Sequence, residues 1–131
     1  MPFGINHVHL KTKDPKKTAD WWVKAFNFTI LSDETRPTGD RFIRCRAEDG
    51  LGVNISGARA GDEMGPADGG LHFGLEHFGL DSSDVAADIE RLQAMGCELQ
   101  EGPTDAGSGM RIAFLKAPDD VRIELIQHDA G

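Results

Sequence analysis

The sequence predicts an α+β fold in which two tandem β-α-β-β-β modules form a curled eight-stranded mixed sheet around a central cleft. The first indication is a repeat at a fixed offset of 70 residues, as expected when one structural unit is used twice. The second is the order of apolar patterns in each half, which runs strand, helix and three further strands. The residues that recur at this offset are the pairs His7/His77, Leu10/Leu80, Asp14/Asp84, Gly39/Gly109, Arg41/Arg111, Ala47/Ala117 and Asp49/Asp119, and Asn54 falls opposite Glu124.

Module 1 is expected at about residues 3–57 and begins with a strand at 3–12, where apolar and polar residues alternate. Asp14 and Pro15 are typical of a helix cap followed by the first helical position, and the helix should run through Phe26. A turn is expected at 35–40 and a tight connection at 48–50. The three remaining strands are expected at 28–33, 41–47 and 51–56.

A linker rich in Gly, Ala and Asp is expected at 58–70, so that residues 1–131 form a single domain of two modules. Module 2 should cover about 71–128, beginning with a strand at 71–80. Ser82 or Ser83 is expected to cap a helix over 84–95 that ends at Gly96. The other expected features are strands at 98–100, 111–116 and 121–127, a flexible loop at 102–109 and a hairpin turn at 118–120.

Composition excludes several classes of protein. The formal charge is 14 − 22 = −8 without a basic stripe, which argues against a nucleic-acid binder. No apolar stretch approaches the roughly 20 residues of a membrane span, and the N-terminus lacks the pattern of a secretion signal. Cys45 and Cys97 are expected to be small buried apolar residues rather than a disulfide framework, which favours a reduced, cytoplasmic setting.

Strand alternation places four polar residues on the sheet faces away from the helices. His7 and His77 lie in the first strand of their modules, and Asn54 and Glu124 lie in the last, each opposite apolar neighbours. If the two sheets combine about a pseudo-twofold axis, these groups converge at its centre. Two imidazoles, a carboxylate and an amide would be costly to bring together without a cation or hydrogen-bond partners. His72 is expected on the opposite face, as a structural or interface histidine.

This pattern resembles the vicinal oxygen chelate superfamily, which includes glyoxalase I, methylmalonyl-CoA epimerase, fosfomycin-resistance enzymes, extradiol dioxygenases and bleomycin-binding proteins. The matching segments are NHVHLKTKD, EHFGLDSSD and PDDVRIELI, and the resemblance covers roughly residues 3–127. It implies that His7, His77, Glu124 and Asn54 hold one divalent metal ion, with Zn, Ni, Co, Mn, Mg and Fe not distinguished. Asn54 stands where glyoxalase I has a second carboxylate. It could therefore bind the metal directly or donate a hydrogen bond to a neighbouring ligand.

The resemblance implies a metal-dependent lyase or isomerase of the glyoxalase I or epimerase type, which acts on a small carbonyl substrate through an enolate. Glu124 or His9 would move the proton. Three arginines could hold an anionic group of the substrate, and these are Arg122, Arg111 and Arg41.

Two alternatives remain open at this point. One is an Fe(II) ring-cleaving dioxygenase that uses His7, His77 and Glu124. The other is a non-catalytic protein that binds a small molecule, as in antibiotic resistance of the bleomycin-binding type. The expected partners are a small-molecule substrate and a second copy of the chain in a homodimer, with neither nucleic acid nor membrane.

Overall fold

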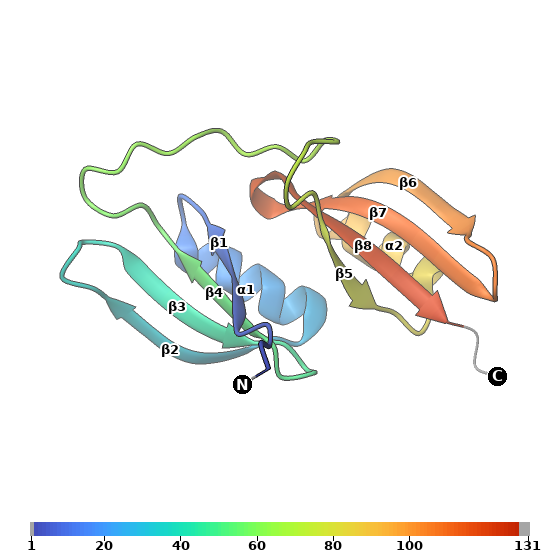
Figure 1. Ribbon diagram of the computed structural model, residues 1–131, viewed down its shortest axis with the longest axis horizontal. Coiled ribbons are helices and arrows are strands. Elements are labelled where there is room, and N and C mark those ends of the chain that lie inside the picture. The colour runs from blue at the N-terminus through green and yellow to red at the C-terminus, as the bar shows by residue number, and fades with distance from the viewer. Residues whose placement is uncertain (1, 129–131) are drawn as a thin grey trace. The chain divides into compact units, whose positions relative to one another are not determined.

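A computed structural model describes residues 2–128 of the protein (Figure 1). The chain divides between Gly65 and Pro66 into two compact units, and this boundary lies inside the expected linker. Each unit is one β-α-β-β-β module with its own four-stranded mixed sheet. The predicted α+β class and the duplicated module are therefore confirmed. We call the described residues of the two units module 1 (2–65) and module 2 (66–128).

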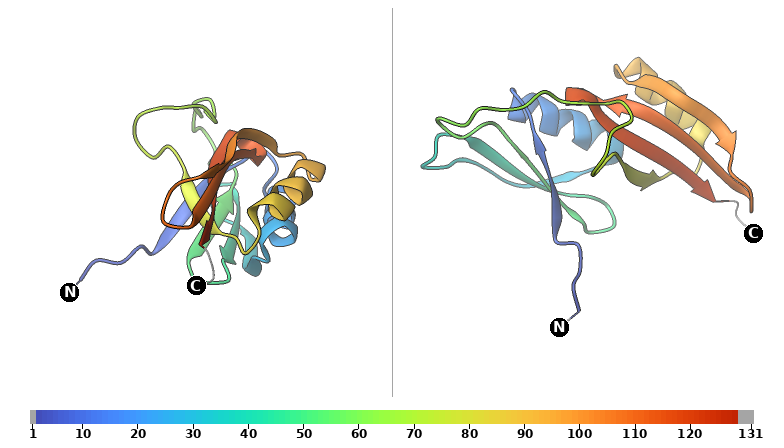
Figure 2. Two further views of the ribbon diagram at one scale, coloured as in Figure 1. Left: turned by 90° about the vertical axis from the view of Figure 1, so that its right-hand side faces the viewer. Right: turned by 45° about the horizontal axis from the view of Figure 1, so that its top comes forward.

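Module 1 has its strands in the order β1-β4-β3-β2, with β1 parallel to β4 and the other neighbours antiparallel. The helix packs against β2, β3 and β4 on one face of this sheet (Figure 2). The elements of the module are β1 (His7–Lys11), α1 (Pro15–Phe26), β2 (Thr29–Thr35), β3 (Arg41–Arg46) and β4 (Gly52–Ser56).

Helix α1 begins and ends as its sequence predicts. The carboxylate of Asp14 accepts a hydrogen bond from the backbone N–H of Lys17 at 3.2 Å, and Pro15 occupies the first turn, where no N–H is needed. Asn27 ends the helix in the left-handed conformation with φ 57°, which asparagine tolerates well. Trp22 is fully buried and stacks on Phe28, so it lies in the core of module 1.

Module 2 repeats the arrangement with the strand order β5-β8-β7-β6, and α2 packs against β6, β7 and β8. Asp84 caps α2 by accepting from the backbone N–H of Ala87, so the prediction that Ser82 or Ser83 would be the cap was wrong. The Ser82 hydroxyl instead donates to Asp88 at 2.6 Å. The elements are β5 (Phe78–Asp81), α2 (Val85–Ala94), β6 (Glu98–Asp105), β7 (Met110–Ala117), the 3₁₀ turn η1 (Pro118–Asp120) and β8 (Val121–His128).

The first strand of each module is shorter than its apolar pattern predicts. β5 begins at Phe78 rather than at residue 71, and β1 begins at His7 rather than at residue 3. For β1 the reason is the length of the partner strand, since β4 begins only at Gly52, the partner of His7. In module 2, β8 begins at Val121, two residues before the partner of Phe78, so it does not reach residues 71–75. The leading segments therefore have exposed apolar side chains, among them Phe3, Ile5, Leu71, Phe73 and Leu75.

The prediction of a loop at 102–109 was also wrong in part, because β6 continues through Asp105. Its pairing with β7 shifts register on both sides of Glu101, so the strand is irregular where Gly102 and Pro103 suggested a loop. Gly102 has φ 86°, and a Cβ there would lie 2.7 Å from the carbonyl oxygen of Ile112. The glycine therefore permits a close approach of two strands rather than ending one.

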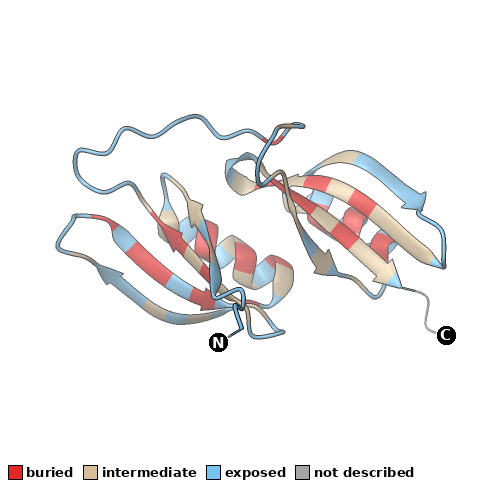
Figure 3. Cartoon of the chain, viewed as in Figure 1, coloured by how far each residue is buried: buried red, intermediate tan, exposed pale blue. Residues whose placement is uncertain are grey.

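Burial alternates along the central strands as the sequence predicts (Figure 3). Ile123 and Leu125 of β8 are fully buried beneath α2, whereas Glu124 between them is half-buried on the open face. Cys45 and Cys97 are buried, as expected for small apolar residues, and burial raises the pKa of each thiol to about 11. Within residues 2–128, neither helix has the length and apolar character needed to span a membrane.

Candidate metal centre

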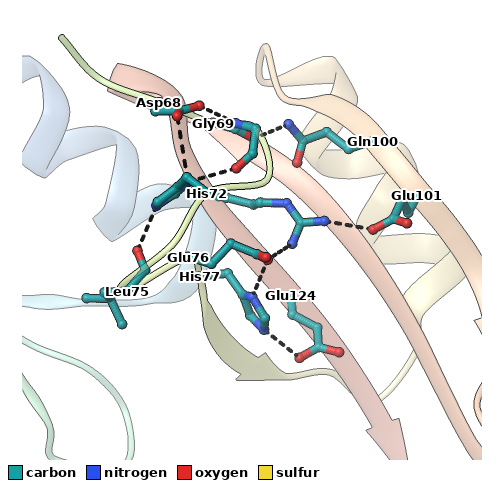
Figure 4. A network of polar contacts seen from close by, with 11 residues as sticks. Asp68, Gly69, His72, Leu75, Glu76, His77, Gln100, Glu101 and Glu124 are labelled. Carbon is teal, nitrogen blue, oxygen red and sulfur yellow. Dashed lines mark hydrogen bonds and ion pairs between the residues drawn. The ribbon is translucent and has the colours of Figure 1, made fainter.

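Two of the predicted metal ligands meet in module 2. His77 directly precedes β5, Glu124 lies in β8, and His77 Nε2 is 3.3 Å from Glu124 Oε1 (Figure 4). Gly79 is the residue of β5 in register with Glu124. A Cβ at Gly79 would lie 3.0 Å from Ile126 Cδ1 and 3.8 Å from Glu124 Oε1, so the glycine leaves space beside the carboxylate.

The second ring nitrogen of His77 also faces a carboxylate. Its Nδ1 lies 2.9 Å from Glu76 Oε1, and an ionised carboxylate is an acceptor only, so this contact favours the tautomer whose Nδ1–H donates a hydrogen bond to Glu76. If Nε2 then carries only its lone pair, two hydrogen-bond acceptors, Nε2 and the Glu124 oxygen, face and repel each other. A positive charge between Nε2 and Glu124 removes this repulsion, and that charge is either a second proton on the ring or a bound cation.

Arg122 contacts two glutamates, and one of them is Glu76. Its side chain is only 3% exposed, and it donates from Nη1 to Glu76 Oε1 at 2.6 Å and from Nη2 to Glu101 Oε2 at 2.7 Å. The guanidinium lies 4.0 Å from the centre of the Phe114 ring, whose edge-to-face contact with His77 spans 5.0 Å. With a neutral imidazole, the three carboxylates and one guanidinium carry −3 + 1 = −2, which a divalent cation would balance.

Module 1 contains the other two predicted ligands, His7 and Asn54. His7 is exposed at the start of β1, and its Nδ1 hydrogen-bonds the amide oxygen of Asn6 at 2.7 Å. Asn54 of β4 is half-buried and lies in register between His9 of β1 and Arg44 of β3. The rings of His7 and His9 are 6.4 Å apart, which agrees with the prediction that they share one face of the sheet.

His9 is held by the end of β4. Its Nε2 hydrogen-bonds the buried Ser56 hydroxyl at 2.7 Å, and the edge of its ring contacts Phe42 at 5.3 Å. Burial lowers the pKa of His9, and the positive charge of Lys11, which donates to the same hydroxyl at 2.9 Å, lowers it further. The neutral ring that accepts protons is therefore favoured near neutral pH.

The three arginines predicted to bind an anion all have carboxylate partners already. Arg41 makes a two-point contact with Asp33 at 2.9 and 2.8 Å, and Arg111 lies 3.4 Å from Asp105. Arg122 is shared between two glutamates as described above. Arg44 differs from them, since no ion pair joins it to a carboxylate of residues 2–128 and its side chain is exposed beside Asn54. The sequence analysis missed Arg44, although its position next to Asn54 follows from strand pairing.

His72 does not lie in a strand, so the expectation that it sits on the opposite face of one was wrong. Its Nδ1 faces the carbonyl oxygen of Gly70 at 2.8 Å and its Nε2 that of Leu75 at 3.0 Å (Figure 4). These carbonyls only accept, so both ring nitrogens donate when the ring is protonated, and this raises the pKa of His72. The residue has a structural role, because it holds a turn of the leading segment.

Each module supplies a pair of candidate ligands. Across residues 2–128, no three or more His, Cys, Asp or Glu side chains are gathered closely enough to hold a metal ion. The module 2 pair nevertheless fits a divalent cation, because the Glu76 carboxylate favours the tautomer that leaves the lone pair on Nε2 and the charges lack two positive units. Sequence reasoning did not identify Asn6, Glu76 or Glu101, although Asn6 and Glu76 also lie 70 residues apart.

The fold and the paired histidines define a class of protein. Residues 4–125 match the family described as the Glyoxalase/Bleomycin resistance protein/Dioxygenase superfamily, so the chain belongs to this superfamily. It is 26% identical over 127 residues to lactoylglutathione lyase GLX1 of Arabidopsis thaliana, a match that covers 92% of this chain. The chain spans only 43% of the length of that relative.

Two solved structures illustrate the range of the fold. FosX, a fosfomycin resistance protein from Listeria monocytogenes complexed with Mn(II) and a dihydroxypropylphosphonic acid, has a TM-score of 0.75 and 21% identity. The match covers 99% of this chain and 96% of that one. TnmS3, an antibiotic binding protein from Streptomyces sp. CB03234, has a TM-score of 0.67 and 25% identity over 98% of both chains.

Proposed function

We propose that the protein is a divalent-metal-dependent lyase or isomerase that acts on a small carbonyl substrate. The observation that carries this proposal is the His77–Glu124 pair, in which an imidazole lies between two carboxylates and a positive charge on its Nε2 side, from a proton or a cation, removes the repulsion. The Mn(II) complex of FosX, which has the same fold, supports the choice of a metal over a proton, and the lyase name of the Arabidopsis relative supports the class of reaction. At the identities involved, these comparisons support the class of reaction and not the substrate.

The ligands that we propose for the cation are the four that the family resemblance implies, and these are His77, Glu124, His7 and Asn54. A divalent ion held there would act as a Lewis acid toward neighbouring oxygens of the substrate and stabilise negative charge on them. Imidazole and carboxylate donors suit Zn, Fe, Ni and Mn alike, so the ligands alone do not select one metal.

Residues of this chain would then move the proton and orient the substrate. Glu124 is our first candidate for the base that removes a proton beside the carbonyl, because it already lies at the proposed metal. His9 is the second candidate, since its lowered pKa favours the neutral ring. Arg44 would hold an anionic group of the substrate beside Asn54, because Arg41, Arg111 and Arg122 are engaged with carboxylates.

Metal binding tests the proposal directly. The protein, purified without chelators, is titrated with Mn(II), Zn(II) and Ni(II) by calorimetry, together with His77→Ala and Glu124→Gln. His72→Ala is the matched control, because His72 belongs to the same module and only holds a turn. We expect stoichiometric binding that both site variants weaken and the control does not. Absence of binding, or equal binding by His77→Ala, would refute the proposal.

A second candidate is non-catalytic binding of a small molecule, which the 25% identity to the antibiotic binding protein TnmS3 favours. Activity of the metal-loaded protein separates the two functions. Turnover of lactoylglutathione, or metal-dependent exchange of solvent deuterium into a small carbonyl compound, is expected for the lyase or isomerase. Oxygen uptake with a catechol after anaerobic Fe(II) loading would instead indicate the ring-cleaving dioxygenase. Ligand binding that persists in a chelator, without turnover, would indicate the binding protein.

A further inference from the structure

We propose that Asn6 and Glu76 are a matched pair of positioning residues, each of which fixes the histidine that follows it, and that Arg122 holds Glu76 in place. Each side chain accepts a hydrogen bond from the Nδ1–H of its histidine, so that Nε2 keeps its lone pair for a metal. This inference rests on the proposed function and assigns roles to three residues outside the ligand set.

The repeat supplies two independent examples of the same contact. Asn6 and Glu76 occupy equivalent positions, 70 residues apart, directly before His7 and His77. The oxygen of each lies close to the Nδ1 of the next residue, at 2.7 Å for Asn6 and 2.9 Å for Glu76. An amide oxygen and a carboxylate oxygen both accept and do not donate, so each favours the tautomer with the proton on Nδ1. Histidine ligands of metals are usually oriented by such a partner.

The difference between the modules supports the role of Arg122 in holding Glu76. Residue 52 is the equivalent of residue 122, and it is a glycine in register with His7. A Cβ at Gly52 would lie 3.1 Å from the backbone oxygen of Asn6 and 3.3 Å from His7 Cβ, so this position has little room for a side chain. The neutral acceptor Asn6 is thus accompanied by glycine, and the charged acceptor Glu76 by an arginine that neutralises it.

Arg122 is itself held by two glutamates and an aromatic ring. Its side chain is 3% exposed, its Nη2 donates a hydrogen bond to Glu101, and the Phe114 ring covers the guanidinium. Because Glu76 is 29% exposed, it would be free to turn toward water without this anchor. The Glu76 oxygen accepts from Arg122 and His77 at the same time, so the arginine determines where the carboxylate meets the ring.

Nuclear magnetic resonance of the metal-free protein tests the positioning role. Nitrogen-15 spectra of the histidine rings, recorded at about pH 8, well above the ordinary histidine pKa of about 6.5, report which nitrogen carries the proton. We expect His77 to carry its proton on Nδ1 in the wild-type protein and to become a mixture of tautomers in Glu76→Ala and in Arg122→Met. Glu76→Gln retains an oxygen acceptor and should keep the wild-type spectrum. Asn6→Ala should release His7 alone.

Zinc affinity, measured by competition with a chelator, provides the second measurement. Loss of such an orienting partner typically costs about 10–100-fold in metal affinity, so we expect a loss in this range for Glu76→Ala and substantial rescue in Glu76→Gln. Glu98→Gln is the control, because Glu98 lies in the same module and pairs with Lys116. An unchanged tautomer in Glu76→Ala, or an affinity equal to that of the control, would overturn the inference. If the wild-type protein binds no zinc, the proposed function fails, whereas the metal-free spectra still decide whether Glu76 and Arg122 fix the ring.

Discussion

Replacing Arg122 by methionine should destabilise module 2 by an amount that its contacts determine. The lost hydrogen bond to Glu76 involves two charged groups with little water around the arginine and is worth about 1.5–3 kcal/mol. The bond to Glu101 contributes at most about 1 kcal/mol, because that glutamate is 60% exposed. The cation–π contact with Phe114 adds roughly 0.5–2 kcal/mol. Methionine restores part of the apolar contact, so we expect a net loss of about 2–3 kcal/mol.

A double-mutant cycle isolates the contribution of the Arg122–Glu76 pair. Urea unfolding is measured for the wild-type protein, Arg122→Met, Glu76→Gln and the double variant. Circular dichroism follows both modules, whereas tryptophan fluorescence follows module 1 alone, because Trp21 and Trp22 both lie on α1. Arg122→Met should cost about 1–2 kcal/mol less in the Glu76→Gln background, since the uncompensated carboxylate is then absent.

Two results would contradict this account of the network. A loss below about 0.5 kcal/mol in Arg122→Met would be within the range of ordinary surface substitutions and would mean that the buried arginine makes no net contribution. A coupling energy near zero would mean that Glu76 and Arg122 act independently, in spite of the 2.6 Å contact between them. Either result would also remove the mechanical basis of the proposed positioning role.

Three further predictions concern other parts of the chain. Arg44→Gln should weaken binding of inorganic phosphate to the metal-loaded protein about tenfold, or about 1.4 kcal/mol, as measured by calorimetry. Hydrogen bonds from Arg36, and then from Thr38, lower the pKa of Asp40 from 3.8 to about 2, so its stabilising effect is complete above the ordinary value and is lost as pH falls toward 2. Asp40→Asn should therefore be less stable than wild type near neutral pH, and the gap in urea midpoint should close between about pH 4 and pH 2. Cys45 and Cys97 should react with a thiol reagent only after unfolding, because burial raises both pKa values to about 11.

Each of these predictions has a control or an outcome that contradicts it. Arg91→Gln on α2, whose arginine pairs with Asp88, should leave phosphate binding unchanged, and equal weakening by both variants would deny Arg44 a specific role. A midpoint gap for Asp40→Asn that stays constant down to pH 2 would mean that the carboxylate titrates normally. Rapid labelling of either cysteine in the folded protein would show that its surroundings open readily.

The fold could be predicted where local chemistry and burial agree. The Asp14–Pro15 start of α1 and Gly96 after α2 carry their own conformational preferences, and the structure follows them. The errors arose where a strand depends on its partner. The apolar alternation at 71–75 has no partner strand to pair with, and the irregular half of β6 does, in spite of Gly102. Sequence alone does not give the length of a neighbouring strand.

Of the candidate site, only the strand face on which each residue lies could be predicted from the sequence. The position of Glu124 between buried Ile123 and Leu125 follows from alternation, and the structure agrees. The contacts that orient His77 were not predictable in this way, because they join residues from three separate segments of module 2. Arg122 was expected to bind substrate, whereas its guanidinium is shared by Glu76 and Glu101. A single sequence shows an arginine but not the acids that cross-strand neighbours bring to it.

The replacement of Asn6 and Gly52 in one module by Glu76 and Arg122 in the other limits the order in which such a pair can change. An arginine introduced first would lose its water at a site that leaves only 3% of its side chain exposed, with no acid to compensate it. A glutamate introduced first would still reach solvent, because 29% of its side chain is exposed. The low-energy route between the two arrangements therefore passes through a variant that has the glutamate without the arginine. A protein engineer who wishes to make module 2 like module 1 should therefore remove the arginine before the glutamate.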